Sequence, residues 1–339
     1  MSSLAVFVGL DYHQDSVQVC VMDQAGQTLT NRSLANDAQG IDQVVRVYGT
    51  PQAAAIEACC GAADLGQELL ERHHWPVQLA HPGYVARIKQ SPDKTDFGDA
   101  RLLADLVRVG YLPKVWLAPE EIRRLRRLVR HRQQLVNRRR DVKLRMRALL
   151  RENRQRPPAA INAWTKAWFA WLEQDAELAD DDRWIMDEHA RDIRQLTRRI
   201  RVVEQRLAQR AENDVVMQRL LQMAGVGLIT AATLRAEIGR FDRFRSGKQL
   251  SRFCGASPRN ASSGQRQADA GLIKAGNPHL RTVLIELAHR LIRRLKGRWS
   301  KLAYKLMCQG KPRNVVVAAV ANRWVRWLYH QMQPAALAA

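Results

Sequence analysis

The chain has 339 residues, with 55 Lys and Arg against 33 Asp and Glu, a formal net charge of +22 and a pI near 10.7. This length predicts two or three domains, and an apolar content of 46% provides enough core to exclude a disordered basic tail. Arginine supplies 44 of the 55 cations, and its planar guanidinium binds phosphate bidentately, so nucleic acid is favoured over a merely anionic surface.

The first 116 residues predict a mixed α/β sheet. Residues 4–10 are a β-rich apolar run that ends at Asp11, and alternating valines indicate a second strand at residues 16–22. A turn follows, so these two strands are expected to be antiparallel, with an acid at the end of the first. The remaining elements are a strand at 27–34, a helix near 38–48, a buried strand at 53–56 that runs into Glu57, a helix near 64–73, a strand at 77–80 and a helix from Asp96 that closes the domain.

Residues 117–213 change to long helices and predict a helical coiled-coil region. Apolar residues recur at intervals of seven from Leu128 to Leu149, and at alternating intervals of three and four from Ile193 to Leu207, which is typical of a coiled-coil seam. Pro157-Pro158 is expected to break the first of these helices.

The same region carries tryptophans and a dense set of arginines. Trp164, Trp168 and Trp171 stand at helical spacing and are interpreted as packing aromatics rather than a base-stacking platform. Residues 117–172 hold 16 basic and 4 acidic side chains, a net charge of +12. As a purely solvated face such a helix would repel itself, so nucleic-acid phosphate is the favoured partner. The predicted contacts on it are Arg123, Arg127, Arg130, Arg138 and Arg139.

Residues 214–339 predict a mostly α-helical C-terminal domain. Within it, residues 216–339 hold 22 basic and 4 acidic side chains, a net charge of +18. Two helices are expected to flank Gly225-Val226-Gly227, the second of them over residues 228–238. Such a helix-hairpin-helix-like turn leaves backbone N–H groups free for a DNA phosphate, although a simple tight turn is the alternative. The stretch 280–333 is expected to be mostly amphipathic helix, with Trp324 and Trp327 near its close.

Four carboxylates in the first domain predict a metal site. Asp11 and Glu57 end two strands, and Asp96 and Asp99 share one face at the start of a helix. Oxygen donors converging from these elements suit Mg²⁺ or Mn²⁺, and two such ions roughly 4 Å apart can stabilise the entering and leaving oxygens of a phosphodiester displacement. The alternatives are structural: Asp96 as a helix N-cap, Asp99 next to the helix dipole, and a net charge of −4 over residues 1–116 that is only a solvated acidic face.

The order Asp11, Glu57, then Lys94-Thr95-Asp96-Phe97-Gly98-Asp99-Ala100 resembles the DEDD transposases of the "one-ten" family of bacterial insertion sequences. Glu57-Ala58-Cys59-Cys60-Gly61-Ala62 is more similar to the "eleven-eleven" branch of that family. The resemblance covers about residues 5–335 and implies a RuvC-like N-terminal domain of the RNase H fold. Its C-terminal motifs are residues 223–227, Phe253-Cys254-Gly255-Ala256-Ser257-Pro258-Arg259, Ser262-Ser263-Gly264 and Lys274-Ala275-Gly276-Asn277.

The resemblance also implies a serine nucleophile, which matches Ser263, with Ser262 beside it as the alternative. A serine hydroxyl is a poor nucleophile near neutral pH and needs a base or a metal, together with stabilisation of the developing phosphorane charge. No histidine lies in this loop, which favours activation by the acidic metal site. The predicted nucleic-acid contacts of this domain are Gly225, Gly227, Lys248, Arg259, Arg266 and Lys274.

On this resemblance, the protein is expected to be an insertion-sequence transposase that recombines double-stranded donor and target DNA. The resemblance implies guidance by a structured non-coding (bridge) RNA, which fits abundant arginine and the lack of an evident helix-turn-helix. It further implies homo-oligomers, a dimer or tetramer, whose active sites combine domains of two protomers. The coiled-coil seam is compatible with this assembly but equally with pairing inside one chain.

Three other functions are considered. A RuvC-like structure-selective nuclease or resolvase would use the same four acids to activate water, without a covalent intermediate. An actin-like ATPase or sugar kinase shares the strand hairpin and the acid at position 11, but residues 50–116 contain no second glycine-rich phosphate loop. A non-catalytic basic scaffold leaves the four carboxylates unexplained.

Cysteine usage and hydropathy indicate in which cellular compartment the protein is expected. The cysteines are Cys20, Cys59, Cys60, Cys254 and Cys308, and since none form a CxxC pair, neither a zinc site nor a disulfide framework is predicted. The N-terminus has no basic segment followed by a long apolar one, and no window approaches 18 apolar residues. We therefore expect no membrane insertion, and a bacterial, cytoplasmic protein associated with the nucleoid.

Overall fold

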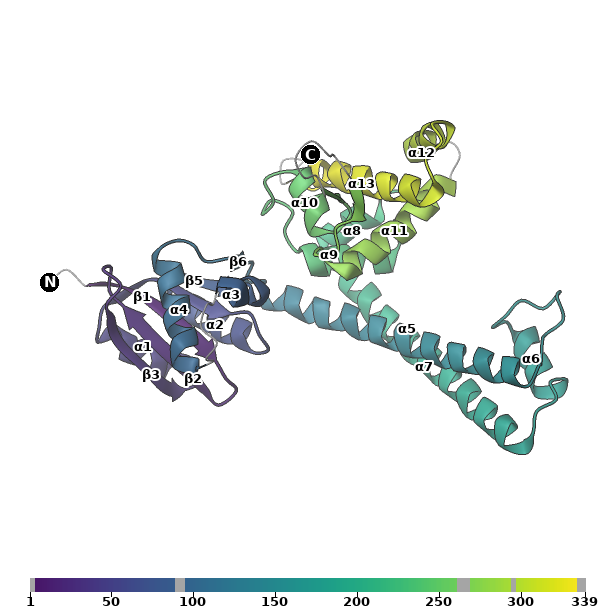
Figure 1. The fold of residues 1–339 in the computed structure, drawn as a ribbon, viewed down its shortest axis with the longest axis horizontal. Coiled ribbons are helices and arrows are strands. Elements are labelled where there is room, and N and C mark those ends of the chain that lie inside the picture. The colour runs from purple at the N-terminus through teal and green to yellow at the C-terminus, as the bar shows by residue number, and fades with distance from the viewer. Residues whose placement is uncertain (1–3, 89–94, 261–268, 294–296, 334–339) are drawn as a thin grey trace. The chain divides into compact units, whose positions relative to one another are not determined.

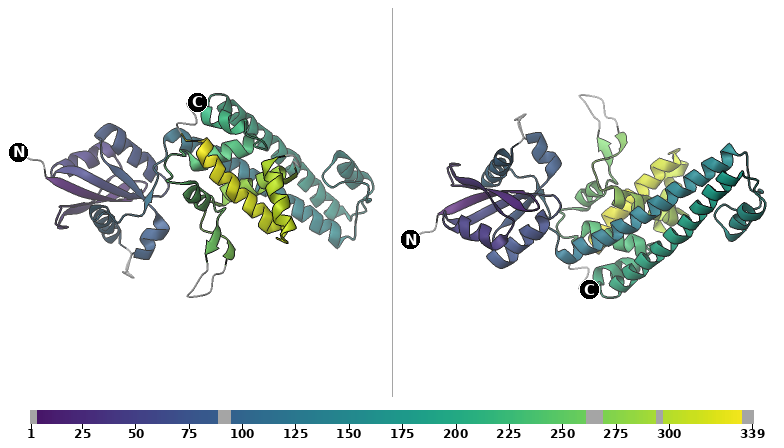
Figure 2. Two further views of the ribbon diagram at one scale, coloured as in Figure 1. Left: turned by 90° about the horizontal axis from the view of Figure 1, so that it is seen from above. Right: turned by 90° about the horizontal axis from the view of Figure 1, so that it is seen from below.

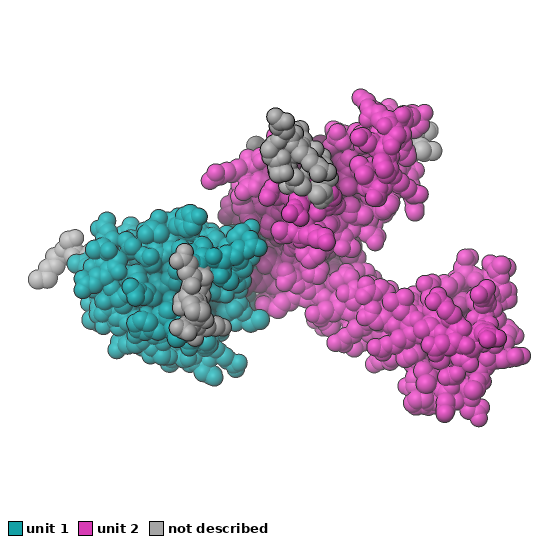
Figure 3. All heavy atoms as spheres, viewed as in Figure 1, with its two compact units in different colours: residues 1–121 teal, residues 122–339 magenta. Residues whose placement is uncertain are grey.

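A computed structural model describes residues 4–88, 95–260, 269–293 and 297–333 of the chain (Figure 1). The chain divides into two compact units, residues 1–121 and 122–339, which Figure 3 colours separately. The second unit contains residues 122–213 of the predicted coiled-coil region together with the predicted C-terminal domain. Among the described residues, none of the helices combines the length and the apolar character needed to span a bilayer.

Unit 1 is built on a six-stranded mixed sheet in the order β3-β2-β1-β4-β5-β6, which confirms the predicted mixed α/β architecture. The predicted strands at 16–22 and 77–80 match the structure to the residue, whereas β6 had no sequence prediction. Strands β1, β2 and β3 are antiparallel neighbours, β4 runs parallel to β1 and β5 parallel to β4, and β6 is antiparallel to β5. The strands are β1 (Ala5–Tyr12), β2 (Ser16–Met22), β3 (Thr28–Ala35), β4 (Thr50–Glu57), β5 (Val77–Ala80) and β6 (Lys114–Val115).

Helices cover both faces of this sheet (Figure 2). On one face, α1 (Ala38–Arg46) and α2 (Ala62–His73) bury their apolar residues against Val6, Val8 and Leu10 of β1. On the other face, α4 (Asp96–Arg108) packs against β1, β2 and β4, and α3 (Pro82–Ile88) adds Val85 to the same apolar layer. The side chains of a strand alternate between the two faces, so β1 contributes to both layers.

In unit 2, the two long helices α5 (Glu120–Glu152) and α7 (Asp180–Glu212) form an antiparallel pair. The Arg132 guanidinium lies 2.7 Å from the Glu204 carboxylate, and Arg139 Nη1 donates to Thr197 Oγ1 at 3.1 Å. Moving seven residues forward on α5 therefore corresponds to moving seven residues back on α7. Their apolar stripes belong to one buried cluster, so the predicted coiled-coil seam pairs within one chain.

The sequence predicts that Pro157-Pro158 breaks the first long helix. In the structure, however, α5 already ends at Glu152. The Asn153 side-chain amide donates to Leu149 O at 3.1 Å, and Arg154 has a φ of 56°, in the left-handed region that ends helices. The chain has therefore left the helix before Pro157. Between the long helices lies α6 (Lys166–Gln174), and its tryptophans Trp168 and Trp171 are buried in the coiled-coil core, as predicted.

The rest of unit 2 is a helical bundle with a short β-hairpin. Helix α9 is buried on two sides, because Ala231 and Leu234 pack in the bundle core while Ala232 and Ala236 pack against the coiled coil. This continuity joins the bundle and the coiled coil within the second unit. The elements are α8 (Val215–Leu221), α9 (Leu228–Ile238), α10 (Gly247–Phe253), β7 (Pro258–Asn260), β8 (Asp269–Leu272), α11 (Pro278–Arg293), α12 (Arg298–Cys308) and α13 (Arg313–Gln331).

Candidate active site

The ends of β1 and β4 bring Asp11 and Glu57 to the same edge of the sheet. In the parallel pairing of these strands Leu10 lies opposite Ile56, so Asp11 and Glu57 occupy the next position of the ladder. Two residues earlier Gly9 lies opposite Ala55, and both contribute to the face that α4 covers. By the period of two in a strand, the Asp11 and Glu57 side chains point to the α4 side.

Close approach of α4 brings its first turn to this edge. A Cβ added at Gly9 would lie 1.9 Å from Ala100 O and 2.5 Å from Ala104 N, so glycine is what allows the helix backbone to rest on β1. Asp96 and Asp99 lie in the first turn, directly before Ala100. The N-cap of the helix is Thr95, whose hydroxyl accepts a hydrogen bond from Gly98 N at 3.1 Å, and not Asp96 as in the structural alternative.

Asp11 and Asp96 meet around a histidine that the sequence analysis missed. His13 Nε2 lies 3.5 Å from an Asp11 oxygen and 3.2 Å from an Asp96 oxygen, and one donor atom from each of the three residues lies within 4.8 Å of the others. The Asp11 side chain is 19% exposed and that of Asp96 is 56% exposed, so the cluster opens to solvent. The signal in the sequence was the spacing, because residues i and i+2 at the end of a strand share a face.

Glu57 and Asp99 lie near this cluster without belonging to the set of three donor atoms. Both side chains are partly buried and both have polar interactions within the chain. Burial raises the pKa of the Cys59 thiol, and the negative charges of Glu57 and Asp11 raise it further. The influence of both carboxylates on one thiol agrees with their adjacent positions at the sheet edge.

A hydrogen-bond chain across the sheet fixes the start of α4. Gln18 Nε2 on β2 donates to Asn31 Oδ1 on β3 at 2.8 Å, and Asn31 Nδ2 donates to Phe97 O at 2.9 Å. Phe97 lies between the two acids of the first turn of α4. The side chain of Asn31 therefore ties the position of that turn to the antiparallel half of the sheet.

The predicted serine nucleophile and its alternative, Ser263 and Ser262, lie outside the described residues, as does Arg266. The segment that contains them is flanked by β7 and β8, which pair antiparallel with Pro258 opposite Leu272. Arg259 and Lys274, on either side of this hairpin segment, are exposed, as is Lys248 on α10.

The predicted phosphate contacts on α5 have different environments. Arg127 and Arg138 are exposed, whereas Arg123 and Arg139 are partly buried, and Arg139 donates to Thr197. Arg130 donates to the buried Glu237 carboxylate through two nitrogens, at 2.9 and 3.0 Å.

Glu237 also receives a hydrogen bond from the Asn277 amide, at 2.8 Å. Although burial acts to raise the pKa of this carboxyl, the hydrogen bonds and charge of Arg130, together with Asn277 and Arg126, hold it below its usual range. Arg130 thus has a structural role in joining α5 to the bundle.

The turn with Gly225 and Gly227 joins α8 to α9, so two helices flank it as predicted. Gly225 has a φ of 83°, which favours glycine, and its carbonyl accepts from Arg290 Nε at 3.1 Å. Gly227 is the N-cap of α9, and a Cβ there would meet no atom within 4 Å. The N-terminus of α9 is therefore open on the glycine side.

An acidic cluster that could hold a divalent cation, in a chain whose other unit is strongly arginine-rich, is typical of enzymes that act on nucleic-acid strands. Comparison with known proteins identifies the family of enzymes to which the chain belongs. A family model described as transposase, for the DEDD domain of IS110 elements, matches residues 8–154, and a second, described as the transposase IS116/IS110/IS902 family, matches residues 217–305. The chain belongs to the IS110 family of transposases, enzymes that act in DNA strand transfer.

Relatives match over nearly the whole chain. A probable family 20 transposase of Pseudomonas aeruginosa is 29% identical over 328 residues, which is 95% of each chain. The transposase for insertion sequence element IS1111A of Coxiella burnetii is 26% identical, covering 93% of this chain and 86% of the relative. The transposase for insertion sequence element IS1328 of Yersinia enterocolitica is 26% identical over 94% of each. The expected family resemblance is thus confirmed.

Proposed function

We propose that this transposase holds Mg²⁺ or Mn²⁺ with Asp11, Glu57, Asp96 and Asp99, and cuts and rejoins DNA through a phosphoserine at Ser263. The observation that carries the proposal is the meeting of Asp11 and Asp96, from a strand and a helix far apart in the sequence, within 4.8 Å of each other. Unit 1 has a six-stranded mixed sheet with Asp11 and Glu57 at the same edge. This arrangement supports an RNase H-like, RuvC-like fold for the unit.

The donor set fits a divalent cation. Carboxylate oxygens from β1, β4 and α4 are the ligands that Mg²⁺ and Mn²⁺ prefer, and the solvent-open side of the cluster leaves room for water and phosphate. The imidazole of His13 is a further donor, which Mn²⁺ accepts more readily than Mg²⁺. When bound there, the cation would supply stabilisation of the negative charge that develops on the phosphate oxygens.

The protein's own groups have separate tasks in this proposal. The Ser263 oxygen bonds to phosphorus as the bond from phosphorus to a deoxyribose oxygen breaks, and the serine proton passes to the departing oxygen. Rejoining is the same exchange with the hydroxyl of a second strand. Exposed cations beside the serine segment, such as Arg259 and Lys274, orient the DNA through its phosphates.

The nucleophile is tested with two neighbouring variants. Ser263→Ala is expected to abolish the covalent protein–DNA adduct on a denaturing gel, whereas the matched control Ser262→Ala retains it. An adduct that persists in Ser263→Ala and disappears in Ser262→Ala would move the nucleophile by one residue. Hydrolysed DNA ends without any adduct in the unmodified protein would favour the structure-selective nuclease.

The metal site is tested by calorimetric titration with Mn²⁺ and Mg²⁺. Asp11→Asn and Asp99→Asn are expected to lose metal binding and strand exchange while DNA binding is largely kept. Asp105→Asn is the control, because it removes an acid from the same helix where it pairs with Arg108 instead. Equal losses in all three variants would contradict the assignment. His13→Ala should weaken Mn²⁺ more than Mg²⁺.

We further propose a structured non-coding RNA as the guide and a homo-oligomer as the active form. Support comes from the family membership and from the arginine excess, since a protein that delegates sequence reading to RNA binds backbone and shape. The test is whether the purified protein retains one specific RNA, together with its mass by light scattering in the presence of that RNA. A protein that is monomeric and RNA-free, yet fully active, would contradict both.

A further inference from the structure

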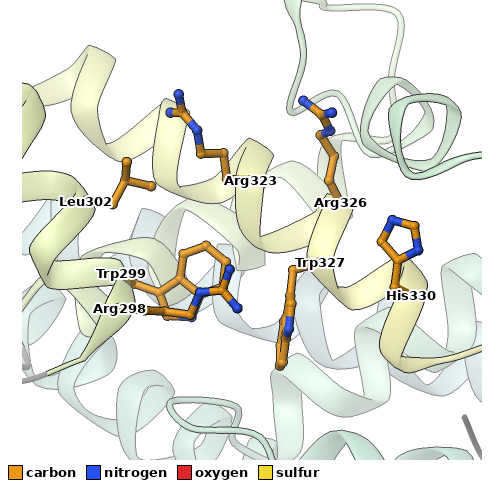
Figure 4. Close-up of a pocket in the computed structure, with 7 residues that line it drawn as sticks. All are labelled: Arg298, Trp299, Leu302, Arg323, Arg326, Trp327 and His330. Atoms are coloured by element: carbon orange, nitrogen blue, oxygen red, sulfur yellow. The ribbon is translucent and has the colours of Figure 1, made fainter.

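One face of α13 combines cations and an aromatic ring. Arg323, Arg326, Trp327 and His330 stand at i, i+3, i+4 and i+7, so they lie along a single stripe of the helix. Helix α12 faces this stripe with Trp299, and the two helices enclose a pocket of about 540 Å³ (Figure 4). A pocket of this volume lies within the range of small-molecule sites.

The pocket has tryptophan walls that are only partly buried. The rings of Trp299 and Trp327 lie 5.9 Å apart at an interplanar angle of 70°, and Trp324 backs them from the core at 6.2 Å from Trp327. The Arg298 guanidinium carbon lies 4.7 Å from the centre of the Trp299 ring. The aromatic surface is therefore rigidly supported from behind and reachable from the pocket.

The charge around this pocket is of one sign. Arg298, Arg323 and Arg326 line it, and none of them forms an ion pair within the described part of the chain. The sequence contains no Asp or Glu after Glu286, so residues 287–339 offer no carboxylate with which these arginines could pair. Within the described residues, these arginines are therefore available to bind an external anion.

Tight packing holds α13 in place beneath the arginines. A Cβ added at Gly247 of α10 would lie 2.9 Å from Arg326 O and 3.0 Å from its Cα, so the two helix backbones are in close contact there. Asn322 donates to Ser251 Oγ at 2.8 Å and to Ala256 O at 3.1 Å. The α13 side of the pocket is thus preorganised. Ligand binding therefore costs little free energy for ordering the residues of this helix.

Arg323 and Arg326 also line a second cavity, of about 1030 Å³, on the side of the β7–β8 hairpin. That cavity adds Arg313 and His289 to the basic surface. The two arginines therefore lie between two pockets. The α12–α13 pocket is lined by aromatic rings, and the larger cavity is mainly apolar. A polyanion with regularly spaced charges could bind along Arg323 and Arg326 while its side groups enter the adjacent pocket.

We propose that the α12–α13 pocket binds an unpaired nucleotide of a DNA strand, with its base against Trp299 and Trp327 and its flanking phosphates on Arg323 and Arg326. This inference rests on the action of the protein on DNA and adds a single-strand subsite to it. Stacking on aromatic rings beside a cationic track is how proteins bind single strands without reading their sequence. A duplex keeps its bases stacked inside, so it cannot reach the tryptophan walls without unpairing.

The test uses full-length protein in EDTA, so that binding is scored without strand chemistry. A fluorescein-labelled single DNA strand of 12 nucleotides and its blunt duplex serve as probes. Each is titrated with the unmodified protein, with Trp327→Leu and with the double variant Arg323→Gln/Arg326→Gln, and binding is followed by fluorescence anisotropy. Trp327→Leu is expected to weaken single-strand binding about tenfold, with duplex binding unchanged. The double arginine variant should reduce the salt slope for the single strand by about 0.7 for each phosphate that the protein no longer neutralises.

Two matched controls accompany these variants. Trp184→Leu removes a 63% exposed tryptophan from α7, and Lys305→Gln removes an exposed cation from α12 that does not line the pocket. Both are expected to bind the single strand like the unmodified protein. Circular dichroism melting curves verify that each variant is folded, and Trp327→Phe should rescue binding, because a smaller aromatic ring still stacks.

Three results would overturn the proposal: unchanged single-strand affinity in Trp327→Leu, equal losses for single strand and duplex, or tighter binding of an RNA 12-mer of the same sequence than of the DNA. Capture of an acidic peptide in place of the DNA strand would overturn it as well. The covalent adduct of Ser263 and Mn²⁺ binding at Asp11 are measured separately in the same variants. A failure of the pocket therefore leaves those two readouts intact, and a failure of the catalytic proposal leaves the anisotropy result intact.

Discussion

Replacing Gly9 by alanine tests whether the approach of α4 to the sheet builds the acidic site. The added Cβ would lie 1.9 Å from Ala100 O and 2.5 Å from Ala104 N. Both are backbone atoms in the middle of a helix, so they cannot move aside independently. To regain an ordinary van der Waals distance, α4 must move away from β1 by about 1.5 Å.

The structure sets the size of the expected effect. Overpacking of a core costs about 1–3 kcal/mol, and we expect the upper end because the clash involves backbone and loosens the packing of Ala100 and Ala104 against Cys20 and Met22. The free energy of unfolding, measured by urea denaturation and circular dichroism, should fall by about 3 kcal/mol. Asp96 moves with the helix while Asp11 stays on the strand, so Mn²⁺ affinity should fall about tenfold, a difference of about 1.4 kcal/mol.

Gly66→Ala is the matched control. Gly66 lies in α2 of the same unit, and its added Cβ would meet only side-chain carbons, the nearest at 3.3 Å. Its stability should stay within about 1 kcal/mol of the unmodified protein, since alanine is also the better helix former. A Gly9→Ala protein with unchanged stability would refute the packing argument. Lost stability with unchanged Mn²⁺ affinity would show that the position of α4 does not control the metal site.

Three further predictions concern other interactions. Asn31→Leu removes the hydrogen bond to Phe97 O and should lower Mn²⁺ affinity severalfold in calorimetry with little change in melting temperature; unchanged affinity would contradict the role of Asn31. Glu237→Gln should lower stability by about 2 kcal/mol at pH 7. Because the folded pKa of Glu237 is depressed, its stabilisation is present above the unfolded pKa of about 4.3 and is lost as pH falls further, so melting curves of variant and unmodified protein should converge in acid. Burial raises the pKa of Cys20 to about 11 and also raises that of Cys254, so a maleimide should label neither thiol until the protein unfolds, and rapid native labelling would contradict their burial.

Much of unit 1 could be predicted from the local pattern of residues. The alternation of valines in β2 and the apolar run of β1 indicate strands directly, because a half-buried strand repeats every two residues. The short strand β6 and helix α3 were not predicted, since they are defined mainly by their neighbours in space. The end of α5 was misplaced, because a left-handed residue at Arg154 has no sequence signal as strong as a proline.

The candidate site was predictable in part. Asp11, Glu57, Asp96 and Asp99 stand out because acids at strand ends and in a first helical turn are a recognisable pattern. His13 was missed, because its proximity to Asp96 depends on the approach of α4 to the sheet. Arg130 was interpreted as a phosphate contact, and only the packing of α5 against α9 reveals its carboxylate partner, Glu237.

The mixed sheet, the heptad seam, the order of the acids and the excess of arginine can all be recognised along the chain, because they depend only on local periodicity, residue order and composition. Tertiary structure decided which strand and helix ends meet, that the seam of α5 and α7 closes within one chain, and that α12 and α13 place two tryptophans beside arginines without carboxylate partners. The physical reason is that these properties depend on distances between residues far apart in sequence. Packing sets such distances, and Gly9 and Gly247 allow the closest of them.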